Sequence, residues 1–231
     1  MMRMKTITLL LGLMTVQNTH SSGLYAGIKG GVSAFSGNHT SVLNSAPSFT
    51  SDKKFKYNSP LVGVQAGFLF QPTMKFFIFP EISATYNFSN AAEDLKNPQT
   101  SVVDGKRKIS RSYGFGAALG AGIRFHPALG VFGKISYEMQ NFKIAYTDLS
   151  FTNITKYDYA KLNKKILLGG GLISSLTNTL FVTFNYDYGF KNSSKVYDFP
   201  GIGAASTRTT TLSVKEHRLG IGLNYFFWTV T

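Results

Sequence analysis

Apolar residues alternate with small or polar residues along most of the chain after residue 22. Residues 112–125 show the pattern most clearly, because Tyr113, Phe115 and Leu119 alternate with glycines and small residues. Alternation with a period of two places apolar side chains on one face of a strand and the others on the opposite face. The pattern predicts eight strands, within residues 24–35, 61–70, 76–88, 112–125, 131–140, 164–173, 180–190 and 211–227.

The connections between these segments alternate in length. The short ones are residues 71–74, 126–130 and 174–179, and the long ones are residues 36–60, 89–111, 141–163 and 191–210. Strands of nine to eleven residues are long enough to cross a bilayer when tilted. Short turns on one side and long loops on the other are typical of outer-membrane barrels. We therefore expect an all-β fold, an eight-stranded antiparallel up-and-down transmembrane β-barrel with four long extracellular loops.

A soluble lipocalin-like barrel or β-sandwich is the alternative, and it would turn the apolar faces inward. The opposite faces here are mostly glycine and small polar residues, which suits a narrow, packed lumen. Aromatic residues also gather at the two ends of the apolar faces, as in the interfacial girdles of membrane barrels. One group is Phe68, Phe70, Phe125, Tyr225 and Phe227, and the other is Tyr86, Phe88, Tyr113, Tyr188 and Phe190. These features favour a membrane barrel.

The first 21 residues differ from the rest and predict a cleaved signal peptide. Arg3 and Lys5 precede the apolar run Thr6–Val16, and small polar residues follow. This order is that of a secretory signal. Elsewhere no apolar run reaches the roughly 18 residues of a membrane-spanning helix. We expect residues 22–231 to form one exported barrel domain. The chain has no cysteine, which excludes disulfides, thiolate metal sites and cysteine nucleophiles.

Three segments carry a resemblance to a known family: residues 79–86, residues 184–188 and the last strand. In that strand Gly220, Leu223, Tyr225 and Phe227 follow a glycine, apolar and aromatic order. The chain resembles the eight-stranded outer-membrane β-barrel superfamily, which includes the OmpA-type transmembrane domain, Opa-type adhesins and porin-like surface antigens. The resemblance implies a bacterial outer-membrane location and a C-terminal insertion signal read by the barrel-assembly machinery. Family members usually end on an aromatic residue, whereas residues 228–231 follow here.

Charged residues on the predicted lumen faces form the first candidate site. They are Lys29, Glu81, Arg124, Lys134, Glu138, Lys165, Asp187 and Arg218. Side chains just fill the interior of an eight-stranded barrel, and unpaired charges there are costly. We expect Asp187 to pair with Arg218, and Arg124 with Glu138, each from neighbouring strands. The set is interpreted as a salt-bridge plug, and a gated ion path through a small porin-like channel remains the alternative.

Basic residues in the long loops form the second candidate site. The formal charge is +13, and removal of Arg3 and Lys5 leaves +11, most of it in the loops. The densest patch residues are Lys53, Lys54, Lys56, Lys106, Arg107 and Lys108. Such cations suit lipopolysaccharide phosphates and membrane lipid, acidic host glycans or acidic surface proteins. General solubility and neutralisation of lipid phosphates would explain the same residues. No nucleic-acid-binding motif is present.

Catalytic and cofactor chemistry have little support in the sequence. The histidines are His20, His39, His126 and His217. None has a serine or carboxylate at a spacing that indicates a catalytic triad, and no cluster suits a metal. His39 and His217 could approach each other only across adjoining strands. We therefore expect no enzyme, cofactor or metal site, but a structural or adhesin-like surface protein that acts through its basic loops.

Overall fold

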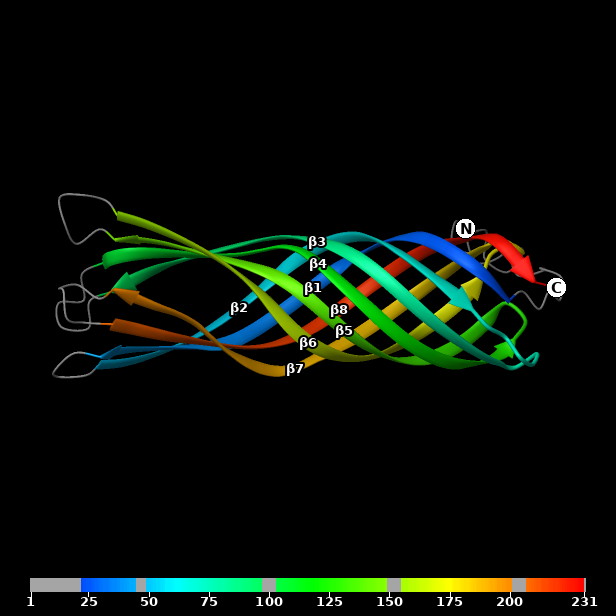
Figure 1. The fold of residues 1–231 in the computed structure, drawn as a ribbon. Helices are drawn as coiled ribbons and strands as arrows, with labels where there is room; N and C mark the ends of the chain where they lie inside the picture. Colours follow the sequence, from blue (N-terminus) through cyan, green and yellow to red (C-terminus); the bar gives the residue numbers. More distant parts are fainter. Residues whose placement is uncertain (1–21, 45–48, 97–102, 149–154, 201–206, 231) are drawn as a thin grey trace, which may run out of the picture.

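The structure, a computed structural model, describes residues 22–44, 49–96, 103–148, 155–200 and 207–230. These residues form a closed antiparallel barrel in which each strand pairs with its neighbours in sequence and β1 pairs with β8 (Figure 1). The strands are β1 Ser22–Asn44, β2 Phe49–Leu69, β3 Phe76–Lys96, β4 Val103–His126, β5 Leu129–Asp148, β6 Thr155–Ser175, β7 Leu180–Pro200 and β8 Thr207–Val230. The predicted eight-stranded up-and-down barrel is confirmed. The predicted signal peptide, residues 1–21, lies outside the described residues.

The two ends of the barrel differ. At the turn end the connections are residues 70–75, 127–128 and 176–179, and Ser22 pairs with Val230. The opposite ends of the strands, near Asn44, Lys96, Asp148 and Pro200, form what we call the projecting end (Figure 1). In the described part of the chain no helix is long and apolar enough to cross a membrane.

The inward and outward faces follow the alternation read from the sequence. Ile28 on β1 and Leu119 on β4 are exposed, whereas Ser33 and Gln140 on the opposite faces are fully buried. The outer apolar residues form a continuous band that ends in exposed aromatics at both levels. Those at the turn end are Phe70, Phe125, Tyr225 and Phe227, and those toward the projecting end are Tyr86, Phe88, Tyr113 and Phe190. An apolar band between aromatic girdles is the surface that a bilayer requires.

The strands are longer than the sequence predicted. They run for 20 to 24 residues, and most of the four ranges expected to be loops continue the strands. Within residues 36–60, for example, β1 and β2 stay paired from Ser36 and Lys56 to Leu43 and Phe49. Beyond the bilayer the outer face meets water, so a strand there needs no apolar outer face. The period-two signal therefore disappears while the hydrogen-bonded ladder continues.

The barrel wall divides above the apolar band. β2 and β3 pair only from Leu61 with Asn87 to Gly67 with Glu81, and β6 and β7 pair only over residues 167–175 and 181–189. The other six neighbours stay paired almost to their tips. At the projecting end two four-stranded sheets result, β7-β8-β1-β2 and β3-β4-β5-β6, with unpaired seams between β2 and β3 and between β6 and β7. We call them sheet one and sheet two.

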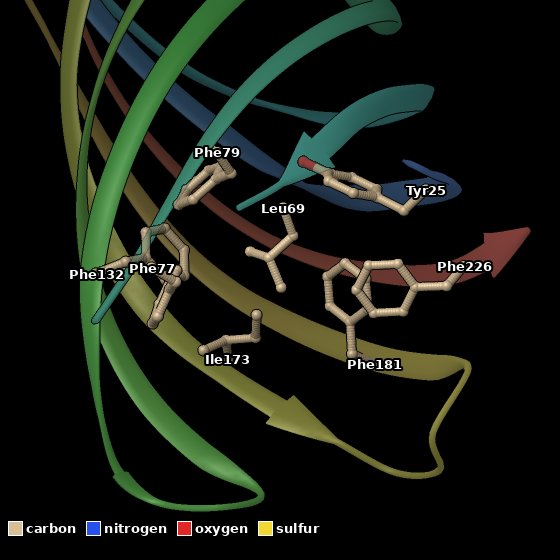
Figure 2. Packing of buried hydrophobic residues seen from close by; sticks show 8 residues of the cluster. All are labelled: Tyr25, Leu69, Phe77, Phe79, Phe132, Ile173, Phe181 and Phe226. Atoms are coloured by element: carbon tan, nitrogen blue, oxygen red, sulfur yellow. The ribbon is translucent and has the colours of Figure 1, made fainter. Parts of the chain in front are cut away.

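An apolar cluster fills the lumen at the turn end, and we call it the aromatic floor (Figure 2). Its members are Tyr25, Leu69, Phe77, Phe79, Phe132, Ile173, Phe181 and Phe226. The rings meet edge to face at 5.3 Å between the centroids of Phe79 and Phe132 and at 5.2 Å between Tyr25 and Phe181. From the sequence we expect mainly small and polar residues on the lumen face. That expectation is wrong at this end, where large rings occlude the lumen.

A second apolar layer joins the two sheets at the projecting end. Phe35, Tyr57 and Val214 contribute to it from sheet one, and Ile109 and Phe142 from sheet two. Phe35 and Tyr57 pack edge to face with their centroids 4.2 Å apart. The charged part of the lumen therefore lies between two apolar layers.

Candidate functional site

Five charged side chains from four strands meet in the lumen, and we call them the central cluster. They are Arg111 on β4, Glu138 on β5, Lys165 on β6, and Glu216 and Arg218 on β8. Alternation turns four of them inward, a register shift between Arg111 and Gly114 turns Arg111 inward, and all are largely buried. Glu138 accepts two hydrogen bonds from the Arg218 guanidinium, at 3.1 and 2.8 Å, and lies 3.0 Å from Lys165 Nζ. The carboxylate is thus paired with two cations.

Glu216 is the most connected member of the central cluster. Its carboxylate accepts from Arg111 Nη2 at 2.8 Å and from Arg218 Nη2 at 3.1 Å. It also accepts from Lys165 Nζ and the Ser33 hydroxyl. The cluster holds three cations and two carboxylates, so its net charge is 3 − 2 = +1. Each carboxylate therefore pairs with more than one cation.

Polar and aromatic neighbours also surround Arg111. Gln140 Oε1 accepts from Arg111 Nη2 at 2.5 Å and from Lys165 Nζ at 3.0 Å. The guanidinium lies 4.5 Å from the ring centroid of Phe35 and 5.6 Å from that of Phe142, within the range of cation–π attraction. Arg111 therefore connects the central cluster to the apolar layer above it.

A second charged level lies between the central cluster and the aromatic floor. Lys134 Nζ lies 3.1 Å from Asp187 Oδ1, and both side chains are nine-tenths buried. Glu81 accepts a hydrogen bond of 2.9 Å from the Tyr25 hydroxyl. Lys29 faces the same part of the lumen, within electrostatic range of Glu81.

A small cavity remains between these charges and the rings of the aromatic floor. Its volume is about 20 Å³, and Tyr25, Glu81, Phe132 and Lys134 are among its lining residues. This is the space of about one water molecule. From one end to the other, the lumen therefore contains aromatic rings, charge pairs, the central cluster and a second apolar layer.

The predicted lumen charges face the interior, but two expected pairings are wrong. Asp187 and Arg218 are neighbours in the β7–β8 register, yet Asp187 pairs with Lys134 and Arg218 with Glu138. Arg124 lies at the turn end, where its guanidinium donates to Pro127 O at 3.0 Å and Ser175 Oγ at 3.1 Å. Along β4, Arg124 is opposite Gly130, whereas Glu138 is opposite Gly116. Eight residues of strand separate those positions, which excludes an ion pair.

Three members of this environment were missed: Arg111, Gln140 as a ligand of the cluster, and Glu216. Arg111 was assigned to a loop, and a register shift between Arg111 and Gly114 reverses the alternation there. Extrapolation of the β4 pattern would turn Arg111 outward. Glu216 was detectable, because continued alternation from Arg218 places it inward. A register shift that reverses which residues face inward cannot be read from the sequence. Alternation that continues without such a shift can be read from it.

The predicted basic patch divides between the two sheets. Lys54 and Lys56 are exposed on β2 of sheet one, and Lys106 and Lys108 are exposed on β4 of sheet two. β3 and the unpaired seam between β2 and β3 separate them. Lys53 and Arg107 lie in these strands, and their side chains are outside the described residues. The patch is therefore two surfaces.

The chain matches a known protein family over most of its length. The outer membrane protein β-barrel domain matches residues 6–227. The chain belongs to this family. Members of this β-barrel family reside in the bacterial outer membrane, in agreement with the apolar outer band. No curated protein is significantly similar to the chain in sequence.

Several solved structures are similar to the chain at low sequence identity. OprG from Pseudomonas aeruginosa is 9% identical, with a TM-score of 0.50, over 90% of this chain and 99% of OprG. Ail, the attachment invasion locus protein of Yersinia pestis, is 11% identical, with a TM-score of 0.39, over 88% of this chain and 99% of Ail. Neisserial surface protein A is 11% identical, with a TM-score of 0.43, over 90% of this chain and all of that protein.

The last strand of this outer-membrane β-barrel presents the residues of the predicted insertion signal on two faces. Leu223, Tyr225 and Phe227 are exposed on the outer face, and Gly220 lies on the lumen face near Asn185. The strand does not end at Phe227. Trp228 pairs with Leu24 and Phe226 with Tyr25, so Phe227 occupies a bulge. The residues after Phe227 thus extend the closing β1–β8 seam, and the insertion signal stays a prediction.

The described histidines of this family member lie apart from one another. His126 is exposed at the end of β4 and accepts a hydrogen bond from Ala128 N at 3.2 Å. His217 faces outward, with Nδ1 2.7 Å from the Tyr186 hydroxyl. The β1–β8 register pairs His217 with Ala34 and His39 with Leu212, so the suggested approach of His39 to His217 is wrong. Within the described ranges no group of three His, Cys, Asp or Glu residues could hold a metal ion.

Proposed function

We propose that this outer-membrane barrel is a structural, adhesin-like surface protein that acts through the basic outer face of sheet two at its projecting end. In this proposal the projecting end faces the cell exterior and the turn end faces the periplasm. The observation that carries the proposal is the contrast between the occluded lumen and the basic outer surface. A binding role uses that surface, whereas a channel requires the interior.

The contents of the lumen argue against the alternative of a small porin. An ion would have to pass the aromatic floor and then the central cluster, whose five charges are paired with one another. The cavity of about 20 Å³ between them holds about one water molecule. Conduction would therefore require large rings and several ion pairs to move together.

The surface on sheet two suits a large polyanion outside the membrane. Lys106 and Lys108 are exposed on β4, seven and five residues beyond Tyr113 of the aromatic girdle. At 3.3 Å per residue these are distances of about 23 and 16 Å along the strand. The lysines thus extend beyond the aromatic girdle toward a partner such as an acidic glycan or an acidic surface protein. We propose binding and not catalysis, because His126 lies at the turn end whereas His217 lies near the middle of β8, away from it.

Binding to an immobilised heparin fragment tests the proposal. Sucrose octasulfate is a heparin analogue, and a crystal structure of Ail in complex with it is known. It serves here as a compact soluble competitor. The K106Q/K108Q variant should bind about tenfold more weakly at 150 mM salt, because two cations near the ligand are lost. K56Q/K215Q, which removes two exposed lysines from sheet one, is the matched control and should bind within about twofold of wild type.

Two results would overturn the proposal. Unchanged heparin binding by K106Q/K108Q would show that Lys106 and Lys108 are not part of the binding surface. In planar bilayers, a steady, large conductance that Glu81→Ala abolishes would show that the lumen is a channel. We expect the wild-type barrel to give no such state.

A further inference from the structure

A hollow on the outer face of sheet one gathers four lysines from three strands. Its volume is about 480 Å³, and we call it the lysine groove. It is lined by Ser36, Gly37, Asn38, Lys54, Lys56, Lys191, Ser213 and Lys215. All four lysines are exposed, and the described residues that line the groove include no acidic residue. The groove is therefore a concentration of positive charge that the lumen network does not use.

The strand register brings the lysines to the two sides of small polar residues. Ser36 on β1 lies between Lys56 on β2 and Lys215 on β8. Neighbouring strands are about 4.8 Å apart, so the backbones of the two lysines are separated by about 10 Å. Lysine stems are long and flexible, and the two ammonium groups can converge on an anion above the Ser36 hydroxyl. A tetrahedral phosphate has the size and the acceptor oxygens for this arrangement.

Beyond Lys56, Ser36 and Lys215, a second row of residues extends the groove away from the membrane. Asn38 lies between Lys54 and Ser213, and Lys191 lies beside Lys215 where the β7–β8 register shifts. Like charges on adjacent strands repel each other in the empty groove. A bound anion would relieve that repulsion, which favours occupancy by a group of more than one negative charge.

The height of the groove points to a lipid headgroup. Val32 and Leu219 are paired and exposed, and they are the last large aliphatic residues of the outer band on β1 and β8. Ser36 is four residues beyond Val32, about 13 Å along the strand and about 9 Å along the normal at a tilt of 45°. His217 and Tyr186, hydrogen bonded to each other, lie on the outer face between these levels. Such amphipathic side chains are typical of the headgroup region.

We propose that the lysine groove binds the phosphate headgroup of a glycolipid in the outer leaflet, with the acyl chains against the apolar band below. The proposal uses the orientation given under the proposed function, with sheet one on the exterior side. A soluble anion would fill the groove without any use of the apolar surface beneath it. A phosphorylated lipid uses both surfaces at once.

Native mass spectrometry of the folded barrel in detergent, titrated with lipid A that carries two phosphates, tests the site. K56Q/K215Q should bind this lipid about thirtyfold more weakly, since each lysine near a lipid phosphate contributes about fivefold. The matched control K106Q/K108Q, with two lysines removed from sheet two, should bind within about twofold of wild type. Lipid A without phosphates should bind wild type and K56Q/K215Q equally weakly.

Equal losses in the two double variants would overturn the proposal, because a general charge effect would then explain the binding. Tight binding of the phosphate-free lipid by wild type would overturn it as well. K56R/K215R should retain binding, and heat-modifiable mobility on gels checks that every variant is folded. Heparin binding that depends on Lys106 and Lys108, without lipid A binding in the groove, would refute this inference alone and leave the proposed function intact.

Discussion

Neutralisation of Glu216 should destabilise the barrel far more than removal of a cation beside it. In the central cluster Arg111, Lys165 and Arg218 face Glu138 and Glu216, a net charge of 3 − 2 = +1. Glu216→Gln leaves three cations and one carboxylate, 3 − 1 = +2. Lys165→Met leaves two of each, 2 − 2 = 0, and keeps an apolar chain of similar length. The first change doubles the unbalanced charge and the second removes it.

The contacts set the magnitudes. Glu216→Gln takes the charge from a carboxylate that accepts from Arg111, Arg218, Lys165 and Ser33 in a fully buried site. Removal of one partner from a buried ion pair costs about 3–5 kcal/mol. Lys165→Met loses contacts to two carboxylates and Gln140, but replacement of a buried charge by an apolar residue is often close to neutral. We expect a cost of about 0–2 kcal/mol.

Urea unfolding of the barrel in lipid vesicles measures both free energies. Trp228 is the sole tryptophan and is exposed on the outer face, so its fluorescence reports exposure of β8 to water. In the double variant the net charge returns to +1, and Lys165→Met should recover part of the loss caused by Glu216→Gln. A smaller loss for Glu216→Gln than for Lys165→Met, or additive losses in the double variant, would refute the charge-balance argument.

Two further changes test the aromatic floor and the last strand. A methyl group at Gly120 would overlap the Phe79 ring, so Gly120→Ala should cost about 1–3 kcal/mol in the same unfolding assay. Gly133→Ala is the control, since a Cβ atom at Gly133 would lie 3.9 Å from its nearest neighbour, Gly169 O. If Gly133→Ala destabilised the barrel as much as Gly120→Ala, the steric argument would be contradicted. Phe227→Ala should lower the fraction of heat-modifiable, assembled barrel in membranes several-fold. Phe125→Ala, at an equally exposed aromatic of the turn end, should leave that fraction unchanged.

The period-two pattern predicts the fold well where one face of a strand meets lipid and the other meets the lumen. It fails where both faces have the same character. At the start of β3, residues 76–79 are all apolar, because Phe76 faces outward while Phe77 and Phe79 belong to the aromatic floor. That unbroken apolar run was the available signal for the floor. Beyond the membrane, residues 36–41 are polar or glycine on both faces, and the strand continues without a periodic signal.

The partners of the lumen charges could not be predicted from neighbouring strands, because most of the ion pairs cross the lumen. Lys134 on β5 pairs with Asp187 on β7, and Glu138 on β5 pairs with Arg218 on β8. A sequence gives the order of strands and, through alternation, the face of each residue. The side chains that meet across a closed barrel depend on tilt and register, and the bulge near Arg111 also changes the phase.

The position of these pairs suggests why the barrel retains so many buried charges. The backbone ladders between β2 and β3 and between β6 and β7 end near Asn87 and Gly189, and Gly189 is the register partner of Glu216. From this level outward, only side chains can hold sheet one to sheet two. Among the described residues, the pairs of Glu216 with Arg111 and Lys165, of Arg218 with Glu138, and of Asp187 with Lys134 each join the two sheets. Apolar packing continues the connection beyond them, between Phe35 and Val214 on one side and Ile109 and Phe142 on the other. Because the pairs of Glu216 lie where the wall hydrogen bonds end, their loss should separate the sheets before it opens a path for ions.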